Sequence, residues 1–259
     1  MGKKVQSNIA IICAVCLVCG ILCGFAVPSE SAGETGTNSD GYEDVAVYVD
    51  GILTTSGYIV EANVVYMPVD RFCAALELPY AVGEPGDGCE FCASIDGVAF
   101  EVADGAEYLT ADERCFYLAD GSHVIGGAYC LPVAEMAALI RADVLWDSAT
   151  GSIDIDTTHT GELMSGDAFY NTEDLLWLAR IIMAESGNQS IEGMMGVGNV
   201  VLNRVADPSC PDTVYGVIFD TRFGVQFSPV ETGSIYCEPN EQALVAAKLC
   251  LEGYNVVGT

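Results

Sequence analysis

The chain has 259 residues and carries 37 acidic against 9 basic side chains, a formal net charge of -28. So negative a chain repels the phosphate backbone, which argues against nucleic acid as a partner. Hydrophobic residues make up 51% of the sequence, enough for two compact domains that each bury a core.

The first segment has the pattern of an export signal. A basic start precedes an apolar run over residues 9–27, and a polar, turn-rich stretch follows it. Small residues favour cleavage after Ala26, while the length of the run also suits a membrane anchor. We therefore expect residues 1–27 to be a signal peptide or membrane anchor and residues 28–43 to be a polar linker. The chain is then exported, and is extracellular or attached to the cell wall or membrane.

Residues 44–157 contain a weak internal repeat. The sequence YMPV at 66–69, followed by RFCAAL, returns as CLPV at 130–133, followed by EMAALI, and each copy leads a short strand through proline into a helix. Alternating strand-like runs surround these units, and the Asp-Gly pairs at 50–51 and 96–97 predict tight hairpin turns. The pattern predicts an α+β module.

This module resembles the copper amine oxidase N-terminal-like domain, with VLWDSATGSIDI as its closing signature. The name implies copper, but His123 and His159 are the only histidines and form no ligand set. We therefore expect no metal and no cofactor.

Eight cysteines follow the export segment, five in the first domain and three in the second. Because both numbers are odd, complete oxidation requires at least one disulfide between the domains; otherwise each domain keeps a free thiol. Export favours disulfide formation. Cys89 and Cys92 have the CxxC spacing of a redox-active pair or of half a zinc site, although no second CxxC or CxxH pair completes a tetrahedral set.

Residues 158–171 form the expected linker into a mainly helical second domain over residues 172–259. Apolar residues recur at helical spacing from Leu175 onward, and Asn171 or Thr172 is placed to cap the start of this helix. Gly187 and Asn188 tolerate left-handed backbone, so we expect the helix to end there.

Glu185 then lies in the last helical turn. A carboxylate at the negative end of a helix dipole, beside apolar neighbours, favours its protonated form. Cleavage of a glycosidic bond needs such a proton donor, because the leaving oxygen must be protonated as it departs. Glu185 is therefore the candidate general acid, and the alternative is a solvated glutamate at a frayed helix end.

A second helix follows, capped by Ser190 and ended by Asp207-Pro208. Its three glycines, Gly193, Gly196 and Gly198, each cost ~1 kcal/mol relative to alanine inside a helix. Close approach of another backbone is the expected compensation, so the two helices should pack tightly.

Four ordered blocks of the second domain resemble the catalytic domain of the spore cortex-lytic cell-wall hydrolases of the SleB and CwlJ type. The blocks are LARIIMAESGNQSIEGMMGVGNVVLNRV, PSCPDTVYGVIF, QFSPV and PNEQALVAAKLCLEGYNVVG. The resemblance implies a lysozyme-like fold, peptidoglycan as the partner and substrate, no cofactor, and Glu185 at the position of the family's general acid. The fold class is thus α+β, an N-terminal two-repeat α+β module followed by a mainly α lysozyme-like catalytic domain.

The resemblance also implies a role for the QFS segment, which lines the groove near the acid in that family. We assign Gln226 and Ser228 to hydrogen bonds with sugars and Phe227 to packing against a sugar face, within a hairpin or loop over residues 223–236. Stabilisation of a turn is the alternative role. The family continues with an aromatic, asparagine- and proline-containing strand that is absent after Thr259, so we expect the chain to be a fragment.

Glycosidases commonly use two carboxylates, and here only Glu192 and Glu231 are near candidates for the second, with a solvated role as the default for both. The resemblance implies lytic transglycosylation, in which Glu185 protonates the bridging oxygen and the 6-hydroxyl of the muramic acid closes an anhydro ring. The competing hypothesis is a non-catalytic cell-wall-binding surface protein.

Overall fold

The computed structural model describes residues 41–59, 64–84, 89–103, 106–222 and 224–258. They divide into two compact units, and the boundary falls between Gly166 and Asp167. The expected export segment lies outside the described residues. Within the described part of the chain, no helix has both the length and the apolar character needed to cross a membrane. Each unit is described below by itself.

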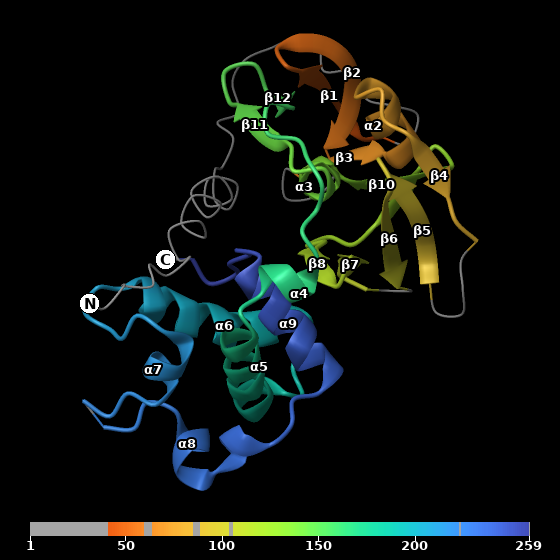
Figure 1. Cartoon of the computed structure of the whole chain (residues 1–259). Coiled ribbons are helices and arrows are strands. Elements are labelled where there is room, and N and C mark those ends of the chain that lie inside the picture. The colour runs from red at the N-terminus through yellow and green to blue at the C-terminus, as the bar shows by residue number, and fades with distance from the viewer. Residues whose placement is uncertain (1–40, 60–63, 85–88, 104–105, 223, 259) are drawn as a thin grey trace, which may run out of the picture. The chain divides into compact units, whose positions relative to one another are not determined.

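The first unit is built on two sheets (Figure 1). The larger has seven strands in the order β11-β12-β1-β2-β3-β10-β9, with β1 and β12 parallel and the other pairs antiparallel. The smaller is antiparallel, in the order β4-β5-β6-β7-β8. The strands of the larger sheet are β1 (Glu43–Val49), β2 (Ile52–Ile59), β3 (Val65–Pro68), β9 (His123–Ile125), β10 (Ala128–Pro132), β11 (Asp143–Asp147) and β12 (Ser152–Asp156). Those of the smaller sheet are β4 (Tyr80–Val82), β5 (Cys89–Ile95), β6 (Val98–Ala103), β7 (Tyr108–Ala111) and β8 (Arg114–Tyr117).

The internal repeat is confirmed in the larger sheet. β3 leads into α2 (Val69–Ala75) and β10 leads into α3 (Val133–Leu139), and each helix starts directly after a proline in extended backbone, Pro68 or Pro132. The two copies are neighbours, because β3 and β10 pair antiparallel with Leu131 opposite Met67. Both of these side chains are fully buried, so the repeated strands supply the centre of the core.

Two Asp-Gly turns form where the sequence predicted them. Asp50-Gly51 and Asp96-Gly97 join β1 to β2 and β5 to β6, with φ values of 50°, 77°, 51° and 83°. Positive φ at both central residues is the type I′ arrangement that matches strand twist, and Asp and Gly tolerate it.

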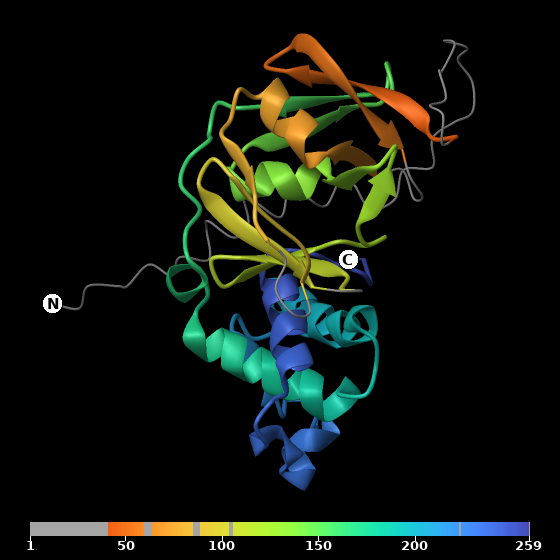
Figure 2. The same cartoon turned by 90° about the vertical axis from the view of Figure 1, so that its right-hand side faces the viewer.

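The second unit is helical (Figure 2). α5 packs against both α6 and α9 and also contacts α7, α8 and the short 3₁₀ helix η2. Its elements are α4 (Gly166–Phe169), α5 (Thr172–Ser186), α6 (Ile191–Ala206), α7 (Val214–Ile218), α8 (Ser228–Thr232), η2 (Ser234–Tyr236) and α9 (Glu241–Leu251). The α+β class predicted from the sequence is therefore confirmed.

The starts of three helices agree with their sequence signals. Asn171 accepts hydrogen bonds from the amides of Glu173 and Asp174, which identifies Asn171 rather than Thr172 as the cap of α5. Ser190 caps α6 and Asn240 caps α9 in the same way. These side chains satisfy amides that have no partner inside their own helix.

Candidate functional site

Glu185 lies at the end of the buried face of α5. It follows Ile181 by four residues and Leu178 by seven, spacings that place all three side chains on one face of the helix. Ile181 and Leu178 are fully buried, whereas Glu185 is exposed. The Glu185 carboxylate is therefore exposed to solvent at the end of α5, one turn beyond the last buried residue of this face.

The polar elbow after Glu185 is ordered by short-range hydrogen bonds. Ser186 is buried and donates its hydroxyl to the Ile182 carbonyl at 2.9 Å. The amide of Gln189 then bonds the Ser186 carbonyl at 2.9 Å. α5 ends at Ser186, so the predicted stop at Gly187 is correct, but Gly187 has φ -58° and ψ -6° and the left-handed backbone expected there is wrong. A tight turn closed by Gln189 ends the helix instead.

Packing of α6 against α5 depends on one glycine. A Cβ atom at Gly198 would lie 2.6 Å from Sγ of Cys250 and 3.0 Å from Cδ1 of Ile182, so side chains from α9 and α5 occupy that space. A Cβ atom at Gly196 would meet only Val257 Cγ1, at 3.5 Å. The expectation of close approach is thus correct for Gly198, with side chains rather than backbone as the neighbours.

A buried asparagine ties the end of the described chain to α6. Asn199 is 3% exposed, donates to the Tyr254 carbonyl at 2.8 Å and accepts from the Val256 amide at 2.8 Å. Asn203, one turn later, donates to the Gly258 carbonyl at 2.8 Å. Residues 254–258 are therefore held along α6 by side-chain amides.

Of the expected hairpin or loop over residues 223–236, residues 225–227 form a loop, but Ser228 then begins helix α8 and Tyr236 ends η2, so no hairpin forms there. Phe227, the residue before α8, is 8% exposed. Its ring lies beneath the Arg204 guanidinium, whose central carbon is 5.4 Å from the ring centroid. Pro229 lies in the first turn of α8, where its missing amide removes no hydrogen bond from the helix.

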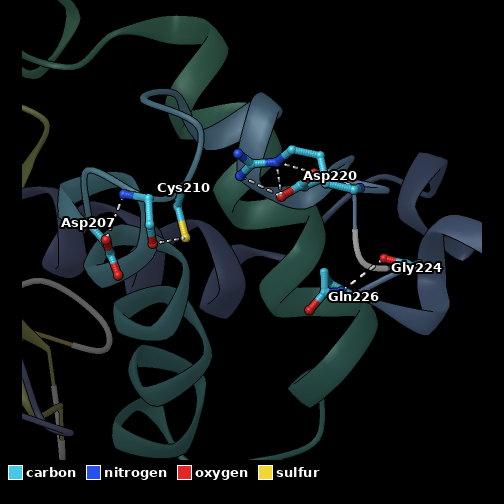
Figure 3. A network of polar contacts seen from close by, with 7 residues as sticks. Asp207, Cys210, Asp220, Gly224 and Gln226 are labelled. Carbon is cyan, nitrogen blue, oxygen red and sulfur yellow. Dashed lines mark hydrogen bonds and ion pairs between the residues drawn. The ribbon is translucent and has the colours of Figure 1, made fainter.

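Gln226 and Ser228 flank this buried ring and are both exposed. The Gln226 amide nitrogen donates to the Gly224 carbonyl at 2.9 Å (Figure 3). Nearby in the chain, Arg222 donates to both carboxylate oxygens of Asp220, and these hydrogen bonds hold the pKa of Asp220 below its usual value (Figure 3). The side chains of Gln226 and Ser228 are thus exposed on a segment that is held by hydrogen bonds within residues 220–226.

The sequence did not single out an aromatic cluster around Trp177 on α5. Its ring centroid lies 5.2 Å from those of Tyr215 and Phe219 and 6.2 Å from that of Tyr236. The side chains of Tyr215 and Tyr236 are 45% and 60% exposed. The Arg180 guanidinium carbon lies 5.0 Å from the Trp177 ring centroid. Tyr215 and Phe219 are four residues apart on α7 and its C-cap, whereas Trp177 and Tyr236 come from α5 and η2, so helical spacing links only the first pair.

The two other candidate acids both lie at the surface. Glu192, in the first turn of α6, and Glu231, in α8, are both exposed. Among the described residues, no group of three or more His, Cys, Asp and Glu side chains is placed to hold a metal ion.

All eight cysteines of the described residues carry free thiols, and four of them are buried. Burial raises the pKa of Cys73 and Cys130 to about 11, which suppresses the reactive thiolate. Cys115 and Cys250 are the other two. The disulfide between the domains, inferred from the odd number of cysteines in each, stays a prediction.

Comparison with known proteins identifies the class of the second unit. Residues 188–259 match the family model described as Cell Wall Hydrolase. The match begins three residues after Glu185, so the candidate acid lies just outside it.

Curated relatives of the second unit are of the spore cortex-lytic type. Spore cortex-lytic enzymes of Bacillus cereus and Bacillus subtilis are 37% and 33% identical over 89 and 86 residues, which are 34% and 33% of this chain and 33% and 27% of those enzymes. The chain thus spans about a third of the length of these curated relatives. The C-terminal part of the chain is similar to their catalytic domain.

Two solved structures are also similar. The catalytic domain of the germination-specific lytic transglycosylase SleB from Bacillus anthracis is 35% identical, covering 37% of this chain and 74% of that chain, with a TM-score of 0.32. The catalytic domain of the Bacillus cereus SleB protein is 37% identical, covering 33% of this chain and 65% of that chain, with a TM-score of 0.31. The resemblance of the first unit to copper amine oxidase N-terminal-like domains stays a prediction.

Proposed function

We propose that this protein cleaves the glycan strands of peptidoglycan as an exported cell-wall enzyme, with Glu185 as the general acid. The observation that carries the proposal is the position of Glu185, on the packed face of α5 and yet exposed at its last turn. The family match to cell wall hydrolases supports peptidoglycan as the substrate. Action on peptidoglycan in turn requires a place outside the cytoplasm, which agrees with the proposed export segment.

Several surface groups are suited to holding the glycan strand. Gln226 and Ser228 carry donors and acceptors that sugars can bind, and both are exposed beside α8. Phe227 is buried under Arg204, so we assign it to holding this segment in place rather than to stacking on a sugar. The exposed edges of the Trp177 cluster offer the apolar surface on which a sugar ring can stack instead.

The reaction that one acid can support is a lytic transglycosylation. Glu185 donates its proton to the bridging oxygen, and that bond to the muramic acid anomeric carbon breaks. The sugar's own 6-hydroxyl then attacks this carbon and closes an anhydro ring, and its proton passes to the Glu185 carboxylate, which restores the acid. A substrate hydroxyl that the strand contacts already hold near the reacting carbon needs no positioned water and no second carboxylate.

Replacement of the acid tests the proposal. Glu185→Gln keeps the size of the side chain and removes its transferable proton, so cleavage of purified sacculi should be abolished while the melting curve is unchanged. Glu173→Gln, an exposed glutamate at the other end of α5, is the matched control and should retain activity. Mass spectrometry of the fragments released by the wild type should find anhydro-muramic acid ends.

Three outcomes would contradict this scheme in different ways. Full activity of Glu185→Gln would remove Glu185 as the acid. Predominantly reducing ends would mean that a second carboxylate holds water, with Glu192 and Glu231 as the first to substitute. A wild type that is inert but still pellets with sacculi would favour a non-catalytic wall-binding protein.

A further inference from the structure

The pairing of β5 with β6 contains a β-bulge at a pair of cysteines in the first unit. Cys92 lies opposite Glu101, Phe91 opposite Val102 and Cys89 opposite Ala103, and the register shifts between Cys89 and Phe91. Glu90 is therefore the extra residue, inserted on β5 with no partner of its own on β6.

The bulge brings the two cysteines to the same face of the sheet. In a regular strand, residues three apart point to opposite faces. Here their partners, Glu101 and Ala103, are two residues apart on β6 and both exposed, whereas Val102 between them is fully buried. Cys89 and Cys92 therefore both project from the outer face, away from the core.

The two thiols are also close enough to react. Cys89 is also an immediate neighbour of the Cys92 thiol: burial first, and then the adjacent Cys89 side chain, raise the pKa of Cys92. The partners of the two cysteines, Ala103 and Glu101, are successive residues on one face of β6, and the Cα atoms of such residues are about 6.4–6.8 Å apart. Disulfides span Cα separations of about 4.4–6.8 Å, so a pair of cysteines facing these two residues lies at the upper end of that range. Both cysteines are only half-buried, unlike Cys73 and Cys130, so a dissolved oxidant reaches them.

The neighbouring strand leaves space for a sulfur at this position. The Gly83 amide, just after β4, donates to the Cys92 carbonyl at 2.8 Å and continues the ladder of β4 and β5. A Cβ atom at Gly83 would lie 2.9 Å from Sγ of Cys92, a contact closer than real Cβ atoms make. The missing side chain at Gly83 thus accommodates the thiol.

We propose that Cys89 and Cys92 form a reversible disulfide across this bulge, made by exchange with a low-molecular-weight disulfide. One cysteine, after losing its proton, attacks the disulfide R–S–S–R and releases one R–S⁻, giving a mixed disulfide. The second cysteine, also deprotonated, attacks the sulfur of the first and releases the other R–S⁻. The two thiolates take up the two protons, so the sum is two protein thiols and R–S–S–R giving one protein disulfide and two R–SH. This site is independent of the proposed glycan cleavage.

Oxidation of the full chain with oxidised glutathione tests the pair. After alkylation and digestion without reductant, the peptide holding Cys89 and Cys92 should be lighter by two hydrogens than its reduced form and should carry no alkyl group. A protease that cuts after Glu90 should then leave two peptides still linked. Cys237, which is exposed and has no cysteine beside it in the sequence, is the internal control and should carry glutathione.

Single variants separate pairing from ordinary surface oxidation. In Cys89→Ser, Cys92 should retain glutathione as a stable mixed disulfide, because no second thiol displaces it, and Cys92→Ser should give the converse. The reciprocal variant covers the case in which one of the two does not fold. Separate glutathione adducts on both cysteines of the wild type, or full alkylation of both after oxidation, would overturn the proposal.

Discussion

Gly198→Ala should destabilise the second unit, although alanine is the better helix former. Two effects oppose each other. Replacement of glycine by alanine inside a helix stabilises by about 1 kcal/mol. The new methyl group, however, would lie 2.6 Å from Cys250 Sγ and 3.0 Å from Ile182 Cδ1, and overpacking of this kind costs about 1–3 kcal/mol. Since both neighbours are buried, the second effect should win by about 1 kcal/mol.

Gly196→Ala is the matched control on the same helix. Its Cβ atom would meet Val257 Cγ1 at 3.5 Å, an ordinary contact, so only the gain in helix propensity remains. It should stabilise the unit by up to about 1 kcal/mol. The two variants, two residues apart, are thus predicted to change stability in opposite directions.

Chemical denaturation followed by tryptophan fluorescence measures both effects. Trp177 belongs to the second unit and Trp146 to the first, so a Trp146→Phe background makes the signal specific. Cys250→Ala should reduce the penalty of Gly198→Ala, with a coupling of about 0.5–3 kcal/mol for residues in contact. Equal stabilisation by Gly196→Ala and Gly198→Ala would refute the packing argument, and zero coupling to Cys250 would show that the strain lies elsewhere.

Two further substitutions probe the anchoring of the chain end and the aromatic surface. Asn199→Ala leaves the Tyr254 carbonyl and the Val256 amide without their buried partner, so it should lower the free energy of unfolding by about 1–3 kcal/mol. Asn203→Ala, at a less buried position, should have a smaller effect. Equal effects of the two variants in chemical denaturation would contradict this. Trp177→Ala should weaken pelleting with sacculi several-fold in an otherwise folded protein; unchanged binding would exclude the cluster from the glycan surface.

The features predicted correctly from the sequence depend on contacts within a few residues. Asn171, Ser190 and Asn240 cap their helices because each reaches an amide two or three positions away. The turn at Asp50-Gly51 forms because its backbone angles suit those two residue types. Such features carry their whole cause in the local sequence.

The features that were missed depend on neighbours distant in the chain. Phe227 is buried beneath Arg204 of α6, and directly after it helix α8 begins where a hairpin or loop was expected. The β-bulge that places Cys89 and Cys92 on the same face of the sheet is visible only in the register of β5 against β6. The CxxC spacing alone is compatible both with a redox-active pair and with half of a zinc site, and it does not distinguish these two interpretations.

The candidate acid lies between these two cases. Helical periodicity places Glu185 on the face that carries Leu178 and Ile181, and this much follows from spacing alone. A carboxylate on a packed face is either buried, which costs several kcal/mol unless it is paired or neutralised, or it marks the point where the packing ends. The structure has the second arrangement, because Ile181 is fully buried and Glu185 one turn later is exposed. Whether Glu185 is buried or exposed depends on how far along α5 the neighbouring helices extend. Tertiary packing, such as the contact of Gly198 with Ile182, sets this extent. If Glu185 is the acid as proposed, Gly198→Ala should therefore lower the rate of sacculus cleavage as well as stability, although Gly198 is on a different helix from Glu185.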